Sequence, residues 1–336
     1  MKIACQISIL GSLAILGSLH AGTSSSLKLV QEIPLPQVKG RIDHMAVDVK
    51  GHRLFVAALG NNTVEVIDLK AGKRVYTISG LAEPQAVLYL ADSNELYITN
   101  GRTGECRILD AVSFRTERKI DFADDADNLR YDSTTHRVYV AYGSGAIGVI
   151  DAVGGTRLGD IKLAGHPESF QIDKASGTIF VNVPSARQIA VLDASALKVK
   201  TIWPLKIAAD NFPIALDTAR HRLFVGTRKP PKLLVFDIQS GGLVQEVAID
   251  GTTDDVFYDA ARKRVYVACG AGFLDVIEQE DASSYVPSER IPTAPGARTC
   301  LFVPESSVLY LAVPIQKDRD AAIYVYEASP SQHSQP

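Results

Sequence analysis

A short apolar pattern recurs along the chain at nearly constant spacing. It consists of three consecutive large apolar residues and occurs seven times, at Leu54–Val56, Leu96–Ile98, Val138–Val140, Ile179–Val181, Leu223–Val225, Val265–Val267 and Leu309–Leu311. The intervals of 42, 42, 41, 44, 42 and 44 residues match the length of one four-stranded blade. The pattern therefore predicts an all-β protein, a seven-bladed β-propeller with four-stranded antiparallel blades.

Acidic residues recur at fixed positions within the repeats. An aspartate stands six residues before the pattern in five repeats, at Asp48, Asp132, Asp173, Asp217 and Asp259. A second acid ends the predicted third strand, at Asp68, Asp110, Asp151, Asp193 and Asp237, with Glu278 and Glu327 in the last two repeats. A carboxylate at a strand end can accept hydrogen bonds from backbone N–H groups of the following turn. We therefore interpret the second set of acids as structural.

The seventh repeat lacks its own fourth strand. After Glu327 the chain becomes a short polar tail, whereas near the N-terminus Leu29–Leu35 begins with the Leu-Val-Gln-Glu found in the fifth blade at Leu243–Glu246. An N-terminal strand that completes the last blade would pair an otherwise open edge. The sequence predicts one propeller domain over residues 27–328 and a disordered tail over 329–336.

The first residues have the pattern of an export signal. Lys2 precedes an apolar run from Ile7 to Leu19, and Ala21 offers a small residue for cleavage. The run is too short to span a bilayer as a helix. We expect a signal peptide over residues 1–21, a periplasmic or secreted protein without a membrane anchor, and a monomer.

Charge and cysteine content narrow the function classes. The net charge is −3, from 35 basic and 38 acidic residues, which argues against an obligate nucleic-acid binder. After cleavage three cysteines remain, Cys106, Cys269 and Cys300, and an odd number leaves at least one free thiol. Whether Cys269 and Cys300 pair stays open.

The sequence shows no motif for haem, flavin or a nicotinamide cofactor. The segment Gly143–Gly148 has the spacing of a dinucleotide fingerprint, but it falls between two predicted strands instead of between a strand and a helix. We interpret these glycines as turn residues.

The repeat resembles that of the YVTN-type propellers, the class that includes the periplasmic YncE proteins and lies near the seven-bladed lactonases. Tyr97–Asn100 comes within one residue of the motif that names the class, and the rhythm of strand, turn and Val-Ile-Asp extends over residues 41–328. The resemblance implies the fold and an exported setting. It implies no reaction, because propellers carry many functions on one frame.

Candidate functional residues collect where the first strand of each blade begins. When the repeats are aligned, the positions four and five residues before the strand-end aspartate form one ring at the predicted channel mouth. This ring and its neighbours supply Asp43, His44, Asp127, Asn128, Glu168, Asn211, Asp254, Asp255 and Arg298, together with His166 and Arg41. Such a concentration of charge predicts a polar binding funnel.

Three hypotheses stay open for this ring. In the first, Arg298 holds the carboxylate or phosphate of a small polar or anionic ligand by a forked contact. In the second, a divalent cation such as Ca²⁺ assists a hydrolase or lyase of a lactone-like substrate, with His44 or His166 as the catalytic base. In the third, the propeller is a platform for an exported protein partner, contacted through the loops at 184–187 and 228–231. Whether the chain is an enzyme is left undecided.

The metal ligands of the second hypothesis are oxygen donors from different blades. They are Glu168, Asn128, Asn211 and Asp255, with Asp254 as a substitute for the last. This set looks like the one that metal-dependent propeller lactonases use. The resemblance to YncE also raises single-stranded DNA as a partner, but the basic and aromatic interleaving that such a groove needs is not apparent.

Overall fold

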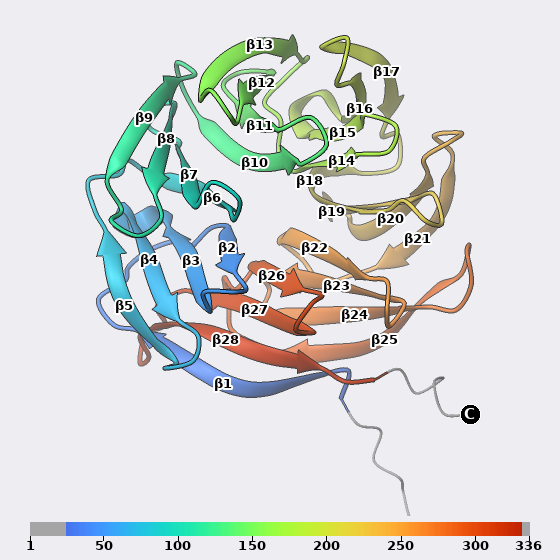
Figure 1. The fold of residues 1–336 in the computed structure, drawn as a ribbon. Coiled ribbons are helices and arrows are strands. Elements are labelled where there is room, and N and C mark those ends of the chain that lie inside the picture. The colour runs from blue at the N-terminus through green and yellow to red at the C-terminus, as the bar shows by residue number, and fades with distance from the viewer. Residues whose placement is uncertain (1–24, 331–336) are drawn as a thin grey trace, which may run out of the picture.

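The seven predicted blades are present as seven four-stranded antiparallel sheets arranged in a ring (Figure 1). The computed structural model describes residues 25–330, so the predicted signal peptide over residues 1–21 lies outside the described residues. Two short 3₁₀ helices, η1 (Leu59–Asn61) and η2 (Pro184–Ala186), accompany the strands in this part of the chain. The seven-bladed β-propeller is therefore confirmed.

Blades one to three follow the chain from the channel outward. Their strands are β2 (Met45–Asp48), β3 (Arg53–Ala58), β4 (Thr63–Asp68), β5 (Lys73–Ile78), β6 (Pro84–Leu90), β7 (Glu95–Asn100), β8 (Glu105–Asp110), β9 (Thr116–Asp121), β10 (Ala126–Asp132), β11 (Arg137–Tyr142), β12 (Ala146–Asp151) and β13 (Thr156–Lys162).

Blades four to seven repeat this order, except that the outermost strand of blade seven is β1. Their strands are β14 (Phe170–Asp173), β15 (Thr178–Val183), β16 (Gln188–Asp193), β17 (Lys198–Pro204), β18 (Ala209–Asp217), β19 (Arg222–Lys229), β20 (Pro231–Asp237), β21 (Leu243–Ala248), β22 (Thr253–Asp259), β23 (Arg264–Cys269), β24 (Phe273–Gln279), β25 (Tyr285–Pro292), β26 (Thr299–Val303), β27 (Val308–Val313), β28 (Ala321–Ala328) and β1 (Leu27–Leu35).

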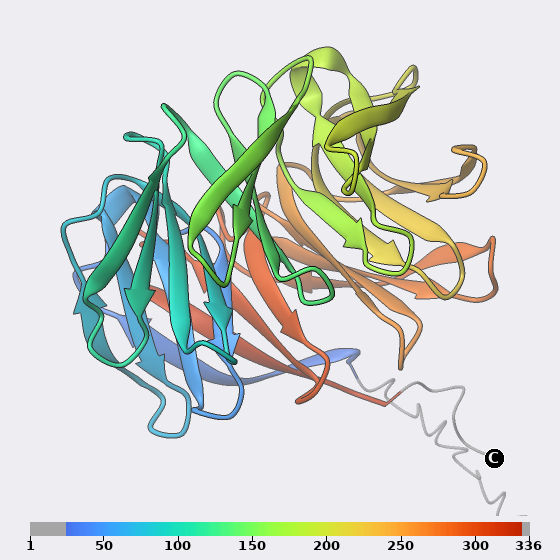
Figure 2. The same ribbon diagram turned by 45° about the horizontal axis from the view of Figure 1, so that its top comes forward.

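The apolar core is divided into layers between neighbouring blades, whose sheets face one another in Figure 2. In β3, Leu54 and Val56 point into the layer shared with blade seven, whereas Phe55 points into the layer shared with blade two. Side chains alternate between the two faces of a strand, and here both faces are buried. This explains why the recurring pattern is a continuous apolar run instead of an alternation.

The five aspartates that end the third strands have the structural role that the sequence predicted, whereas Glu278 accepts from Arg264. Asp68 accepts hydrogen bonds from the backbone N–H groups of Lys70 and Ala71 at 2.8 and 2.9 Å. Asp110, Asp151, Asp193 and Asp237 accept from their own turns in the same way.

The turn between the first two strands has its own recurring geometry. One residue two positions before the apolar pattern has a positive φ in every blade, at His52, Asn94, His136, Gly177, His221, Lys263 and Ser307. Glycine, asparagine and histidine are among the residues found most often in this conformation. Each turn therefore connects its strands through one left-handed residue.

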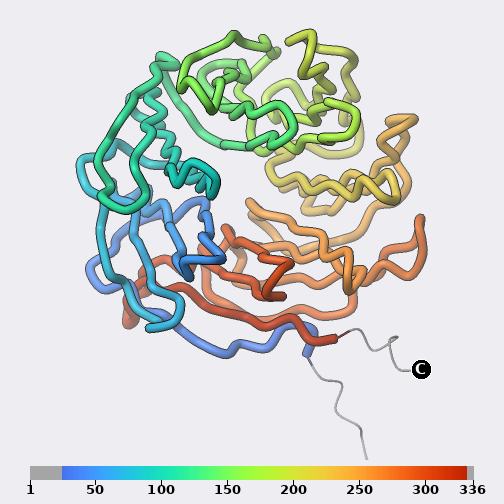
Figure 3. The backbone as a smooth tube through the Cα atoms, viewed as in Figure 1, coloured from blue at the N-terminus to red at the C-terminus, as the bar shows by residue number. Residues whose placement is uncertain are grey.

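The ring closes through the N-terminal strand, as the sequence predicted. Strand β1 pairs antiparallel with β28, from Leu27 opposite Ala328 to Leu35 opposite Ala321, and the two run side by side in Figure 3. Ser329, the first residue of the predicted tail, is hydrogen-bonded to the start of the domain, and residues 331–336 of that tail lie outside the described residues. Its N–H donates to Ser26 O at 3.0 Å and its hydroxyl donates to Ser25 O at 2.8 Å.

The three cysteines Cys106, Cys269 and Cys300 are buried and free in this structure. Gly143 and Gly145 stand in the turn between β11 and β12, both with positive φ. The glycines of this segment therefore serve a turn, as the sequence indicated.

The closing strand offers a direct test of ring closure. Ile33 is fully buried in the layer between blades seven and one, whereas Val30 on the same strand is 43% exposed. We expect Ile33→Ala to lower the free energy of unfolding by about 2–5 kcal/mol, and Val30→Ala to change it by less than about 0.5 kcal/mol. Urea unfolding of both variants measures this difference, and equal effects would show that β1 does not close the ring.

Candidate functional site

The innermost strands of the seven blades are arranged around one central axis (Figure 1). They are β2, β6, β10, β14, β18, β22 and β26. Each contacts the innermost strand of the next blade, and β26 contacts β2. Residues at equivalent positions in the repeat therefore come together around one axis.

A cavity of about 390 Å³ forms a channel along this axis. Its wall includes the residues two positions before the end of each innermost strand, in six of the seven blades: Ala46, Leu88, Arg130, Gln171, Phe257 and Leu301. His44 and Asp255 line it closer to the mouth. Only Arg130 among the six carries a charge, so the cavity combines an apolar wall with one guanidinium and a His–Asp pair.

Asp254 is held by two guanidinium groups at the mouth. Arg298 Nε lies 2.7 Å from Asp254 Oδ2, and Arg228 pairs with the other carboxylate oxygen. Arg228 also donates to Thr253 O at 2.9 Å and lies over the ring of Phe212, 3.5 Å from its centroid. Both arginines are therefore already engaged with the protein.

A second cluster joins Arg41, Asp43, His44 and Asp255. Arg41 Nη2 lies 2.6 Å from Asp43 Oδ2, while the imidazole of His44 stands between two carboxylates, 3.7 Å from Asp43 Oδ1 and 3.5 Å from Asp255 Oδ2. Asp255 Oδ2 also accepts the backbone N–H of Cys300 at 2.8 Å. His44 is thus fixed between two acids.

A third cluster contains Asp127, His166 and Glu168. One ligand atom from each lies within 4.8 Å of the others. His166 Nδ1 lies 2.6 Å from Gly143 O and 3.4 Å from Asp125 Oδ2, and its Nε2 lies 3.7 Å from Asp127 Oδ2. The structure thus brings together three of the predicted site residues.

The four residues that the sequence predicted as metal ligands take part in different interactions. Asn211 is fully buried, and its amide donates to Asn182 Oδ1 at 2.9 Å and to Gln188 O at 3.0 Å. Asp255 is engaged with His44 and Cys300, and Asn128 donates to Asp127 Oδ1 at 3.4 Å. Glu168 instead groups with Asp127 and His166.

Burial and neighbouring charges shift the pKa values of the titratable side chains at the channel mouth. Burial opposes the charged form of His44, but Asp255 and Asp43 raise its pKa to about 10. Burial raises the pKa of Asp43 to about 6 against the pull of His44 and Arg41. Burial and then Asp127 raise the pKa of Glu168 to about 8. Unfavourable desolvation is therefore concentrated at this end of the channel.

Two arginines of the site were not identified in the predicted ring. Arg130 lies two residues before Asp132, so the period of two along a strand places it on the same side as Asn128. Extending the repeat alignment by two positions would have found it. Arg228 was assigned to an interaction loop, but its side chain is turned toward Asp254 and is only 18% exposed. The repeat gives no signal for that contact.

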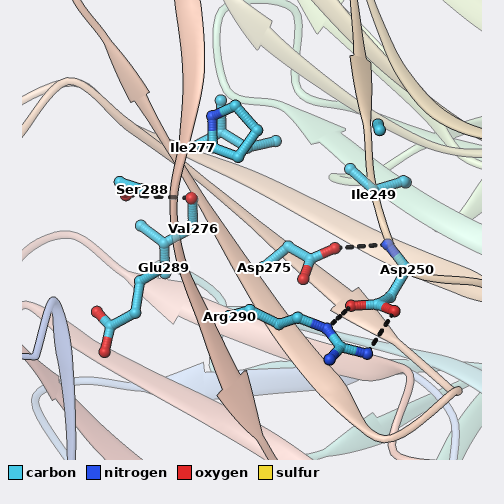
Figure 4. A pocket seen from close by; sticks show the side chains of 10 residues that line it. Ile249, Asp250, Asp275, Val276, Ile277, Ser288, Glu289 and Arg290 are labelled. Atoms are coloured by element: carbon cyan, nitrogen blue, oxygen red, sulfur yellow. Dashed lines mark hydrogen bonds and ion pairs between the residues drawn. The ribbon is translucent and has the colours of Figure 1, made fainter.

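A further groove of about 360 Å³ lies between blades five and six, away from the channel (Figure 4). Arg290 donates hydrogen bonds to both carboxylate oxygens of Asp250, and Asp250 N–H donates to Asp275 at 2.6 Å. Figure 4 shows these groups facing one another across the groove. The charged groups of this groove already pair with one another, so the groove is a weaker candidate for a ligand-binding site than the channel cavity is.

Comparison with known proteins agrees with the architecture. No family model matches the chain. Among curated proteins, it is similar to the uncharacterized protein YncE of Salmonella typhi, with 22% identity over 274 residues that cover 77% of this chain and 65% of YncE. The chain is a seven-bladed β-propeller whose sequence is similar to that of YncE. Because it spans less than two thirds of YncE, the similarity transfers no activity or partner.

Solved structures extend the likeness of fold across distant sequences. They include a chain of the mitotic checkpoint complex (TM-score 0.75, 14% identity, 97% of this chain and 98% of that one) and the WD40 repeats of RRP9 (0.78, 10%, 91% and 99%). They also include a chain of the Kuenenia stuttgartiensis hydrazine synthase, with a TM-score of 0.71 and 16% identity, covering 87% of this chain and 95% of that one. At these identities only the fold is shared.

No helix within residues 25–330 is long and apolar enough to cross a membrane.

The pKa of His44 gives a pH prediction. Because this pKa rises from the ordinary 6.5 to about 10 on folding, the imidazolium stabilises the fold fully below pH 6.5, and the stabilisation is lost as the pH rises toward 10. We expect the stability of the unaltered chain to fall between pH 7 and 9 relative to that of His44→Gln, because over this range the folded chain retains a proton on His44 that the unfolded chain releases. Thermal unfolding across this range measures it, and parallel profiles for the two proteins would contradict the prediction.

Proposed function

We propose that this protein binds a small anionic ligand in the channel cavity, with Arg130 as the group that anchors it. The observation that carries the proposal is the state of the four arginines around the channel. Arg41, Arg228 and Arg298 are each paired with an aspartate. Within residues 25–330, no carboxylate lies within 4.0 Å of the guanidinium of Arg130.

Arg130 lies over the ring of Phe170, 5.6 Å from its centroid, and its hydrogen bonds do not use every N–H of the guanidinium. Nη1 donates to Leu129 O at 2.7 Å and to Asn128 Oδ1 at 3.5 Å, and Nη2 donates to Ser169 Oγ at 3.2 Å. Among the described residues, no acceptor takes the Nε–H or the second Nη2 hydrogen. Arg290 uses its Nε and Nη2 to donate to both carboxylate oxygens of Asp250. Arg130 lines the cavity, and we infer that Nε and Nη2 together would hold a carboxylate or a phosphate there.

The rest of the cavity limits the ligand. A space of about 390 Å³ accommodates a small molecule and not a folded partner. Gln171 and His44 supply polar contacts beside Arg130, whereas Leu88 and Phe257 supply apolar wall. We infer a compact organic anion with a short apolar part. The predictions of a lactone hydrolase and of an interaction platform stay predictions.

The proposal is tested with the full chain in EDTA, using acetate, succinate, citrate and inorganic phosphate as probes. At least one probe should raise the melting temperature saturably. Arg130→Ala should weaken that binding at least about tenfold, because a charge-assisted hydrogen bond contributes about 1.5–3 kcal/mol. Arg130→Lys should bind with intermediate affinity, since it keeps the charge and loses the fork.

Arg319→Ala provides the matched control, because Arg319 is 62% exposed and pairs with Glu32 outside the channel. It should bind the probe like the unaltered chain. Equal affinity in Arg130→Ala, or no stabilisation of the unaltered chain by any of the four anions, would overturn the proposal.

A further inference from the structure

Two neighbouring blades bring an imidazole and two carboxylates together at the channel mouth. Asp127 stands on β10, the innermost strand of blade three, while His166 and Glu168 stand on the segment that leads into β14 of blade four. These innermost strands lie side by side. One ligand atom from each residue falls within 4.8 Å of the other two.

The two carboxylates of this cluster have few partners among the described residues. The side chain of Asp127 is only 9% exposed, yet its Oδ2 receives no hydrogen bond from the described residues and faces His166 Nε2 at 3.7 Å. The carboxylate of Glu168 accepts no hydrogen bond and pairs with no cation within 4.0 Å in residues 25–330. Glu168 is half-buried, so its carboxylate and the Oδ2 of Asp127 stay available to a further partner from solvent.

The orientation of His166 is an independent observation. Its Nδ1 lies 2.6 Å from Gly143 O, a carbonyl outside the cluster, and only a protonated Nδ1 can donate there. That hydrogen bond directs Nε2 toward Asp127. Histidines that bind metals are usually held in this way, with one ring nitrogen donating to a carbonyl and the other turned to the ion.

We propose that Asp127, His166 and Glu168 bind one divalent transition-metal ion, such as Zn²⁺ or Mn²⁺, at the channel mouth. One imidazole nitrogen with two carboxylate oxygens suits these ions. Ca²⁺, which the sequence suggested, takes six to eight oxygen ligands and fits this set less well. A tetrahedral ion with bonds of about 2.0–2.1 Å separates its ligand atoms by about 3.3 Å, close to the observed 3.7 Å between Nε2 and Oδ2.

Three protein ligands leave coordination positions open. In zinc sites with three protein ligands, the fourth position takes water or a ligand. The alternative explanation for the cluster is a simple ion pair between Asp127 and His166. That alternative requires nothing of Glu168, so Glu168 separates the two explanations.

The test uses the full chain after EDTA treatment and removal of the chelator. Titration calorimetry with ZnCl₂ and with MnCl₂ should show one saturable equivalent for at least one ion, with a rise in melting temperature. Glu168→Gln keeps the shape of the side chain and removes its charge. It should weaken binding at least about tenfold, as should His166→Ala, since even outer-shell changes cost about 10–100-fold.

His136→Asn is the matched control, because His136 is exposed on a turn and asparagine tolerates its left-handed φ of 53°. It should bind the ion like the unaltered chain. Undiminished binding in both Glu168→Gln and His166→Ala would overturn the proposal, as would no saturable binding of either ion to the unaltered chain. Because the anion test is run in EDTA with Arg130 variants, the failure of one proposal is distinct from the failure of the other.

Discussion

The packing of one blade against the next is the constraint on which the rest of the structure depends. Each sheet buries both faces, so each blade needs a neighbour on either side, and seven blades satisfy this only as a closed ring. Blade seven reaches that state by taking β1, whose Ile33 and Leu35 fill the last layer beside blade one. Closure then fixes the innermost strands around a channel, and the site is a consequence of that geometry.

The channel mouth shows two kinds of charged group. Asp254 is neutralised by two arginines, which is how buried charges usually persist in a folded protein. Arg130 and Glu168 lack such a partner among the described residues, and Asp127 has only the imidazole of His166, at 3.7 Å. Removing charges from water without pairing them costs stability, and such groups concentrate at functional sites. The unpaired groups, more than the paired ones, therefore indicate where a ligand or an ion would bind.

The similar proteins show how little the architecture says about chemistry. The same propeller frame occurs in a chain of a mitotic checkpoint complex and in one of a hydrazine synthase. What distinguishes this chain lies in a few positions where its repeats differ from one another. Arg130 occupies the repeat position that Leu88 and Phe257 occupy in other blades. This difference between the repeats gives the cavity its single guanidinium.

The sequence alone determined the number of blades, the role of acids such as Asp68, and the pairing of the N-terminal strand with blade seven. These features depend on local hydrogen bonding and on a periodicity that repeats along the chain. Only the tertiary structure decided that Arg228 turns to Asp254 and that Glu168 groups with Asp127 and His166 instead of with Asn211 and Asp255. Such contacts cross between blades, and their distances depend on how neighbouring sheets twist and pack, which no repeat spacing records.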